Sequence, residues 1–280
     1  MTPGHKVSVV GVTTLTPNGE STSGHSVHLL HIDHDPHMLR YNFLAAALPH
    51  CGIVGGRVAK PHSRPYMASL QFYDQHLCGG MLIREDFVLT AAHCKQPLPL
   101  TVVLGAHDIS KKEKSQQRIQ VTKYHQHPKF TGEYDYDIML LEVKLYVKAI
   151  GLPKKDGKIP ANINCAVAGW GQTGVNKPSS NVLKETTEEM QFSFECQALW
   201  KEYFNSQHMI CTKFDKRKGG ICQGDSGGPL ICNSKPQGIT AFTLKGDCNN
   251  PKYPHVFTKV NFFLPWIKKT TAVVSHSANF

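Results

Sequence analysis

Short apolar segments separated by turn-forming residues restrict the fold of this chain more than any other feature. From Ile53 onward, apolar-rich runs alternate with glycine, proline and other residues typical of turns. Segments of this length are typical of β-strands, so the pattern predicts an all-β sandwich or barrel. One late segment, Phe262–Lys269, has helical character. The apolar runs are Tyr66–Phe72, Met81–Ile83, Phe87–Thr90, Val102–Leu104, Ile138–Val143, Ala166–Trp170, Pro229–Cys232, Ile239–Leu244 and Val256–Val260.

Residues 1–52 differ in composition and are interpreted as a leader or propeptide, disordered or mispredicted. Residues 11–24 are rich in Thr, Ser, Gly, Pro and Asn, which is typical of disorder. The run Phe43–Leu48 resembles the end of a signal peptide but is shorter than the ~7–15 apolar residues expected. Histidines recur every third residue from His28 to His37, and such tracts can bind metal, but an unstructured leader is favoured. The domain therefore spans 53–280.

Cysteine content and charge indicate the compartment and the partners. Nine cysteines without a Cys-x-x-Cys motif favour the disulfide framework of a secreted protein over a metal or redox site. The net charge of +10 favours polyanions such as acidic proteoglycan, with an ordinary solvated surface as the alternative. No recognition motif accompanies the charge, so nucleic-acid binding is not expected. No apolar run approaches the ~20 residues needed to span a bilayer.

Three separated motifs supply the groups for nucleophilic catalysis. Ser226 lies in the run G-D-S-G-G-P, His93 in T-A-A-H-C, and Asp137 in D-I-M-L-L. A serine hydroxyl needs a neighbouring base, and that base needs a carboxylate to hold its tautomer and stabilise its charged form. Asp135 is the local rival for the carboxylate, but no apolar strand follows it directly to bury and fix it. The order His, Asp, Ser matches one of the known triad arrangements.

With I-V-G-G at Ile53 and C-G-G at Cys78, these motifs resemble those of the trypsin-like, chymotrypsin-fold serine proteases. The resemblance extends from Ile53 to about Ile267. It implies two six-stranded antiparallel β-barrels and a C-terminal helix, with the active site between the barrels. It also implies the disulfides Cys78–Cys94, Cys165–Cys232, Cys196–Cys211 and Cys222–Cys248, which leave Cys51 unpaired before the mature start. The segment Gly238–Leu244 and the Cys222–Cys248 pair are most similar to granzymes A and K.

The resemblance assigns a role to each residue around Ser226. Ser226 is the nucleophile, His93 the general base and then acid, and Asp137 the group that orients His93. The backbone N–H groups of Gly224 and Ser226 form the oxyanion hole. A cut before Ile53 frees an ammonium group that pairs with Asp225, so activity is conditional on that cut. The residue before the cut is Gly52, which does not favour a tryptic activator.

The expected specificity pocket departs from the family pattern at three positions. Gly220 stands where trypsin-type enzymes carry an aspartate, so tryptic cleavage is not supported. Thr243 and His255 replace two glycines of the pocket wall and add bulk. The pocket is thus expected to be narrow and to accept small side chains; the alternatives are a charged His255 that selects acidic side chains, and a blocked pocket. The acidic alternative predicts a narrow bell in kcat/KM near pH 6.5.

The sequence predicts a secreted or secretory-granule serine endopeptidase that acts on proteins or peptides as a monomer. No cofactor or metal is expected, and none at the loop after Gly105, because it is rich in lysine and poor in the oxygen ligands that calcium needs. The alternative is a weakly active or inactive protease-fold protein that binds acidic polymers. The complete triad favours the enzyme.

Overall fold

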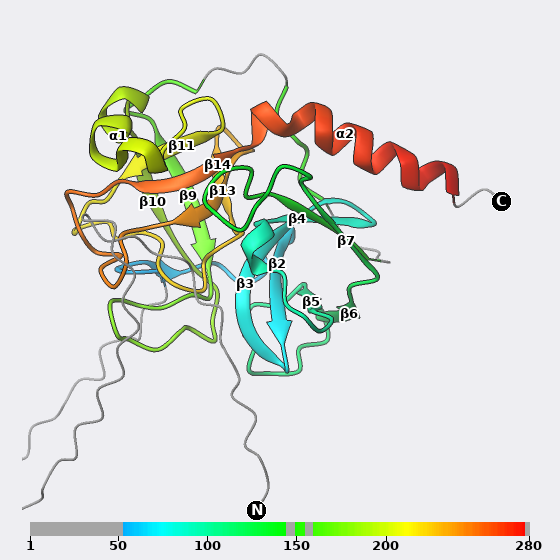
Figure 1. Ribbon diagram of the computed structural model, residues 1–280. Coiled ribbons are helices and arrows are strands. Elements are labelled where there is room, and N and C mark those ends of the chain that lie inside the picture. The colour runs from blue at the N-terminus through cyan, green and yellow to red at the C-terminus, as the bar shows by residue number, and fades with distance from the viewer. Residues whose placement is uncertain (1–52, 144–148, 155–158, 278–280) are drawn as a thin grey trace, which may run out of the picture.

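The computed structural model describes residues 53–143, 149–154 and 159–277 as two antiparallel β-sheets with few helices (Figure 1). This confirms the all-β, chymotrypsin-like fold expected from the sequence. The expected leader at 1–52, with its histidines and Cys51, lies outside the described residues.

The first sheet has the strand order β6-β5-β2-β3-β4-β8-β7. Seven strands are assigned instead of the expected six, because β6 and β7 are separated by only two residues and are halves of one long strand. Backbone bonds from Val121 to Leu100 and from Thr122 to Glu142 continue the pairing across that break, so the sheet closes into a barrel. The bounds are β2 (Met67–Phe72), β3 (Gln75–Arg84), β4 (Phe87–Thr90), β5 (Thr101–Leu104), β6 (Gln117–Gln120), β7 (Lys123–Gln126) and β8 (Met139–Glu142).

The second sheet has the order β1-β10-β11-β14-β13-β12-β9, and an additional pairing of β9 with β10 closes it. The seventh strand here is β1, a two-residue segment paired only to β10 within this sheet, beside the six that form the barrel. The bounds are β1 (Arg57–Val58), β9 (Asn164–Gly169), β10 (Lys184–Met190), β11 (Met209–Lys213), β12 (Pro229–Cys232), β13 (Lys235–Phe242) and β14 (His255–Lys259).

The C-terminal helix joins the two halves of the molecule. Helix α2 (Val260–Ser277) follows β14 of the second barrel and extends toward the first (Figure 1). Its residues Val260, Phe263, Leu264 and Ile267 belong to the hydrophobic core of the first barrel. These positions recur at three- and four-residue intervals, so they form one face of the helix. The helix is longer than the predicted Phe262–Lys269, and no described helix is long and apolar enough to cross a membrane.

Four disulfides connect the elements, and they are the four pairs that the family resemblance implies. Cys78–Cys94 joins β3 to the short 3₁₀ helix η1 (Ala92–Cys94), and Cys165–Cys232 joins β9 to β12. Cys196–Cys211 joins α1 (Ser193–Trp200) to β11, and Cys222–Cys248 joins two loops. A second short 3₁₀ helix, η2 (Lys201–Tyr203), follows α1.

Candidate active site

His93 and Asp137 form a hydrogen-bonded pair in the first barrel. His93 lies on η1 directly after β4, and Asp137 lies two residues before β8, the strand that pairs with β4. The Nδ1 of His93 donates to Asp137 Oδ2 over 2.6 Å, and its backbone N–H donates to Oδ1 over 2.9 Å. Because the carboxylate accepts the Nδ1 proton, it fixes the tautomer that leaves Nε2 able to accept one.

The unengaged nitrogen of His93 is the one that a general base would use. Its Nε2 is buried and has no hydrogen-bond partner in the described part of the protein. Burial lowers the pKa of His93, whereas the charge of Asp137 and its hydrogen bond raise it, and the net pKa lies above the ordinary value. Asp137 therefore stabilises the imidazolium that forms when Nε2 takes up a proton.

The turn that carries Ser226 packs against the residues before His93. The carbonyl of Ser226 accepts a hydrogen bond from Gly79 of β3 over 2.7 Å. Gly227 has a φ of +78°, and a Cβ placed there would lie 2.2 Å from Thr90 Oγ1 and 3.1 Å from the Ala91 nitrogen. Only glycine permits this approach. The second-barrel turn is thus held against the segment leading into His93, although no hydrogen bond joins Ser226 to His93 in the described structure.

Asp135, the rival carboxylate, has a different partner. Its carboxylate accepts from His208 Nδ1 over 2.7 and 2.9 Å and from Asn205 over 3.3 Å. Tyr136, between the two aspartates, has a φ of +56° and stacks on His127 with ring centroids 4.9 Å apart. Each aspartate therefore pairs with its own histidine, and it is Asp137 that contacts His93.

Two backbone N–H groups at the Ser226 turn have no acceptor in the described structure and could bind an anion. The backbone nitrogens of Gly224 and Ser226 donate to no acceptor among the described residues, whereas the Asp225 nitrogen donates to Cys222 over 3.1 Å. Gly224 has a φ of +90°, and its carbonyl accepts from His76 Nε2 over 2.9 Å. The turn is thus fixed while two donors stay unused, as an oxyanion hole requires.

Asp225, the predicted partner of the new N-terminus, is buried. Its carboxylate accepts backbone N–H bonds from Gly171 over 2.9 Å and from Cys222 over 3.0 Å. Burial raises the pKa of Asp225 to about 7, although these two hydrogen bonds lower it. Ile53 is fully buried, and the chain beside it pairs with the specificity segment through a bridge between Val54 and Gly220. In the intact chain the Ile53 nitrogen is an amide and carries no charge to neutralise Asp225.

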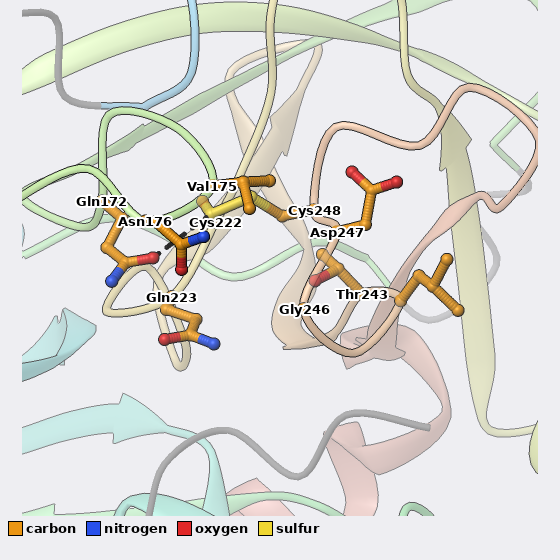
Figure 2. A pocket seen from close by; sticks show the side chains of 10 residues that line it. Gln172, Val175, Asn176, Cys222, Gln223, Thr243, Gly246, Asp247 and Cys248 are labelled. Atoms are coloured by element: carbon orange, nitrogen blue, oxygen red, sulfur yellow. Dashed lines mark hydrogen bonds between the residues drawn. A yellow bond between two sulfur atoms is a disulfide. The ribbon is translucent and has the colours of Figure 1, made fainter. Parts of the chain in front are cut away.

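Of the three predicted pocket residues, Thr243 lines a cavity of about 50 Å³, and Gly220 and His255 do not. Thr243 lines it, together with the disulfide Cys222–Cys248, which lies between Gln172 and Gln223 on one side and Thr243 and Asp247 on the other (Figure 2). His255 is 1 % exposed and lies behind this cavity, with its Nε2 donating to the Cys248 carbonyl over 2.9 Å. A Cβ on Gly220 would lie 2.7 Å from the His255 ring, so the two predicted residues are in contact.

Sequence reasoning missed one residue of this region, Glu188 on β10. It is 1 % exposed, and its carboxylate contacts His255 Nδ1 at 2.9 Å. The surrounding strand, K-E-T-T-E-E-M, is polar except for its last residue and has no apolar run. A glutamate in such a strand is usually solvent-exposed. Nothing in the sequence marks Glu188 as a site residue, because its contact with His255 follows from the strand pairing register, which is known only from the fold.

The described residues contain one compact group of potential metal ligands, formed by Cys78, His93 and Cys94. The two sulfurs form a disulfide and cannot act as thiolate ligands. These atoms therefore belong to the scaffold around His93.

Comparison with known proteins identifies the family. The trypsin family profile matches residues 53–267. The chain belongs to the trypsin family. Rat (Rattus norvegicus) granzyme B is 44% identical over 229 residues, covering 78% of this chain and 90% of the relative, and sheep (Ovis aries) mast cell protease 3 is 43% identical over 247 residues, covering 83% and 96%. The solved structure described as "Structure of GrC" superposes with a TM-score of 0.72 at 37% identity, covering 79% of this chain and 100% of the other.

These findings confirm a trypsin-family serine protease of granzyme type. The two relatives named above are a granzyme B and a mast cell protease. From the segment Gly238–Leu244 and the Cys222–Cys248 pair, the sequence predicted a greater similarity to granzymes A and K. The Cys222–Cys248 disulfide is nonetheless present in the structure.

Proposed function

We propose that this trypsin-family protease is an endopeptidase in which Ser226, His93 and Asp137 act as a catalytic triad. The hydrogen bond from His93 to Asp137, with Nε2 left open, is the observation that carries the proposal. Nε2 takes the proton of the Ser226 hydroxyl as its oxygen bonds to the scissile carbonyl carbon. The imidazolium then gives that proton to the departing amine as the C–N bond breaks, leaving an acyl-enzyme that water hydrolyses by the same steps.

The N–H groups of Gly224 and Ser226 stabilise the oxyanion in this mechanism. They are unused by other acceptors of the described chain and are fixed in one rigid turn. Preorganised donors need no rearrangement when the carbonyl oxygen gains charge, and one such donor is worth about 10²–10³ in kcat.

Cleavage before Ile53 switches the activity on in this proposal. Asp225 is a buried carboxylate that forms no ion pair among the described residues, and burial raises its pKa because it disfavours the charged form. Ile53 has a φ of +45°, which is strained for a β-branched residue. This torsion includes the peptide bond to Gly52, so hydrolysis of that bond removes the strain and creates the ammonium. Both effects favour insertion of the new N-terminus beside Asp225.

The pocket formed by Gly220, Thr243 and His255 gives restricted, non-tryptic specificity. Gly220 at its expected base carries no charge. The cavity that Thr243 lines has about 50 Å³, well below the ~300–1,000 Å³ of sites that bind drug-sized ligands. Small side chains fit such a space. The substrates are then proteins or peptides with a small residue at the cleaved bond.

We further propose secretion or granule storage of a monomer. Four disulfides favour an oxidising compartment. The net charge of +10 favours retention on acidic proteoglycan. The same charge supports the second candidate function, a polyanion-binding homologue without activity.

A serine-reactive fluorophosphonate probe distinguishes the two functions. The full chain carrying an enteropeptidase recognition sequence directly before Ile53 would be cleaved, treated with probe and analysed by peptide mass spectrometry. We expect one adduct, on Ser226, after cleavage and none in S226A. Cleaved protein that binds heparin but shows no adduct would support the binding protein and contradict the enzyme.

A further inference from the structure

Glu188 and His255 form an ion pair that is fully enclosed in the second barrel. Side-chain exposure is 0 % for Glu188 and 1 % for His255, and His255 Nδ1 contacts the two carboxylate oxygens at 2.9 and 3.0 Å. The remaining capacity of the carboxylate is also used, because Oε1 accepts from the Ile221 backbone over 2.8 Å and Oε2 accepts from the Thr212 hydroxyl. A buried ion pair with its other hydrogen bonds satisfied is a specific, built feature.

The hydrogen bonds define the charge of the pair. His255 Nδ1 faces a carboxylate and Nε2 faces the Cys248 carbonyl, so each nitrogen has only an acceptor in front of it. Both nitrogens must therefore carry protons, and the ring is an imidazolium. Burial lowers the pKa of His255, but Glu188 raises it, and the net pKa is above the ordinary value. The pair is neutral as a whole.

The pair lies beside Gly220, the predicted base of the specificity pocket, and is hydrogen-bonded next to the disulfide that lines the cavity. Glu188 accepts from Ile221, which precedes Cys222, and His255 donates to the carbonyl of Cys248. At Gly220, an added Cβ would lie 2.6 Å from Glu188 Oε1 and 2.7 Å from the His255 ring, so the space beneath that backbone is filled. The Phe214 ring packs against His255 at an angle, with ring centroids 5.4 Å apart.

We propose that Glu188 and His255 together are the specificity-determining plug of this protease, closing the base of its pocket so that it accepts only small, uncharged side chains. The inference rests on the proposed function, since it concerns the pocket beside the proposed nucleophile. It assigns to Glu188 a role that its sequence context gives no reason to suspect.

The plug excludes two other substrate classes by different physical effects. An acidic side chain finds no free N–H on His255, because both are committed, and the positive charge is already neutralised by Glu188. If the substrate carboxylate took the place of Glu188 as the partner of His255, Glu188 would remain buried without a partner, which costs several kcal/mol. A bulky apolar side chain meets the ring and carboxylate where an open pocket would continue, and overpacking of this kind is also unfavourable.

Cleavage of a peptide library that varies only the residue before the scissile bond tests this proposal. For the full chain cleaved before Ile53, we expect Ala, Ser, Thr and Val to exceed Asp, Glu, Phe and Leu in kcat/KM by at least ~10-fold. In the double variant E188A/H255G, which removes both charges and the volume they fill, we expect Leu and Phe to gain at least ~10-fold relative to Ala. The matched control is H125Q/E142Q, which removes another histidine–carboxylate pair, in the first barrel, with its atoms 2.6 Å apart. Its library profile should equal that of the wild type.

Ser226 labelling by the fluorophosphonate probe separates the possible failures. Labelled wild-type protein that prefers acidic or bulky residues would overturn the plug and the small-residue specificity, and would leave the proposed triad mechanism intact. Absence of labelling in the wild type would overturn both. If the double variant does not fold, as judged by its thermal transition, a wild-type preference for acidic or bulky residues still overturns the proposal.

Discussion

Asp135 and Asp137 are two residues apart, yet each is paired with a different histidine. Asp137 is 3 % exposed and holds His93 through two hydrogen bonds, whereas Asp135 anchors its loop to His208. Asp137 is predicted from the apolar strand that follows it, and it contacts His93 in the structure. Asp135 lacks such a strand, and its partner His208 lies 73 positions away, so the sequence gives no sign of its role.

Replacing each aspartate with asparagine separates catalysis from stability. D137N should lower kcat by about 10⁴-fold, because an amide permits the tautomer of His93 in which Nε2 carries the proton. D135N should leave kcat within a few-fold and lower the free energy of unfolding by about 1–3 kcal/mol, since a charge-assisted hydrogen bond is weakened. Steady-state kinetics and urea unfolding of the two cleaved variants measure this. Equal losses of kcat would contradict the assignment.

At the level of elements, apolar runs located most of the barrel strands but not the polar ones. Phe87–Thr90 and Pro229–Cys232 were predicted with the bounds of β4 and β12. Strands β1, β6, β7, β10 and β11 were missed. β6, β7 and β10 expose polar side chains or bury them in specific pairs, and β1 has only two residues. β11, M-I-C-T-K, is buried over its first four residues and was missed although its first three are apolar. A strand is recognised from sequence by its hydrophobic pattern, so a strand held by register alone gives no such signal.

The same limit applies to the candidate site. The motifs around His93, Asp137 and Ser226 lie in turns and strand ends whose chemistry is visible in the sequence. The partnership of Glu188 with His255 depends on β10 and β14 lying on either side of β11, which is a property of the folded sheet. It could not be derived from spacing, because the two residues are 67 positions apart.

At the scale of the whole molecule, the proposed activation at Ile53 depends on Asp225, the buried residue that precedes Ser226. In the uncleaved chain the folded-state pKa is raised from 3.8 to about 7, so the folded state binds a proton that the unfolded state has lost. The contribution of Asp225 to stability is full below about pH 4 and is lost as pH rises through 7, by roughly 4 kcal/mol. His76 changes stability with pH in the opposite direction. Burial lowers its pKa to about 4, so its contribution to stability is lost as pH falls from 6.5 to 4.

Comparison with D225N isolates the Asp225 contribution from that of His76. We expect the uncleaved wild type to lose several kcal/mol relative to uncleaved D225N between about pH 4.5 and pH 7.5. In the chain cleaved before Ile53 the relative loss should disappear, because an ammonium beside Asp225 lowers its pKa. Urea unfolding at the two pH values measures both forms. Parallel pH dependence of wild type and D225N in the uncleaved chain would show that this carboxyl does not titrate as described.

The most direct measurement of the central claim is peptide hydrolysis by the chain cleaved before Ile53, compared with its S226A variant, using a substrate with a small residue at the scissile bond. If the Ser226 hydroxyl is the nucleophile activated by His93, S226A should lower kcat by about 10⁴-fold or more without a change in the thermal transition. A folded S226A protein that hydrolyses the same peptide at the wild-type rate would contradict the account.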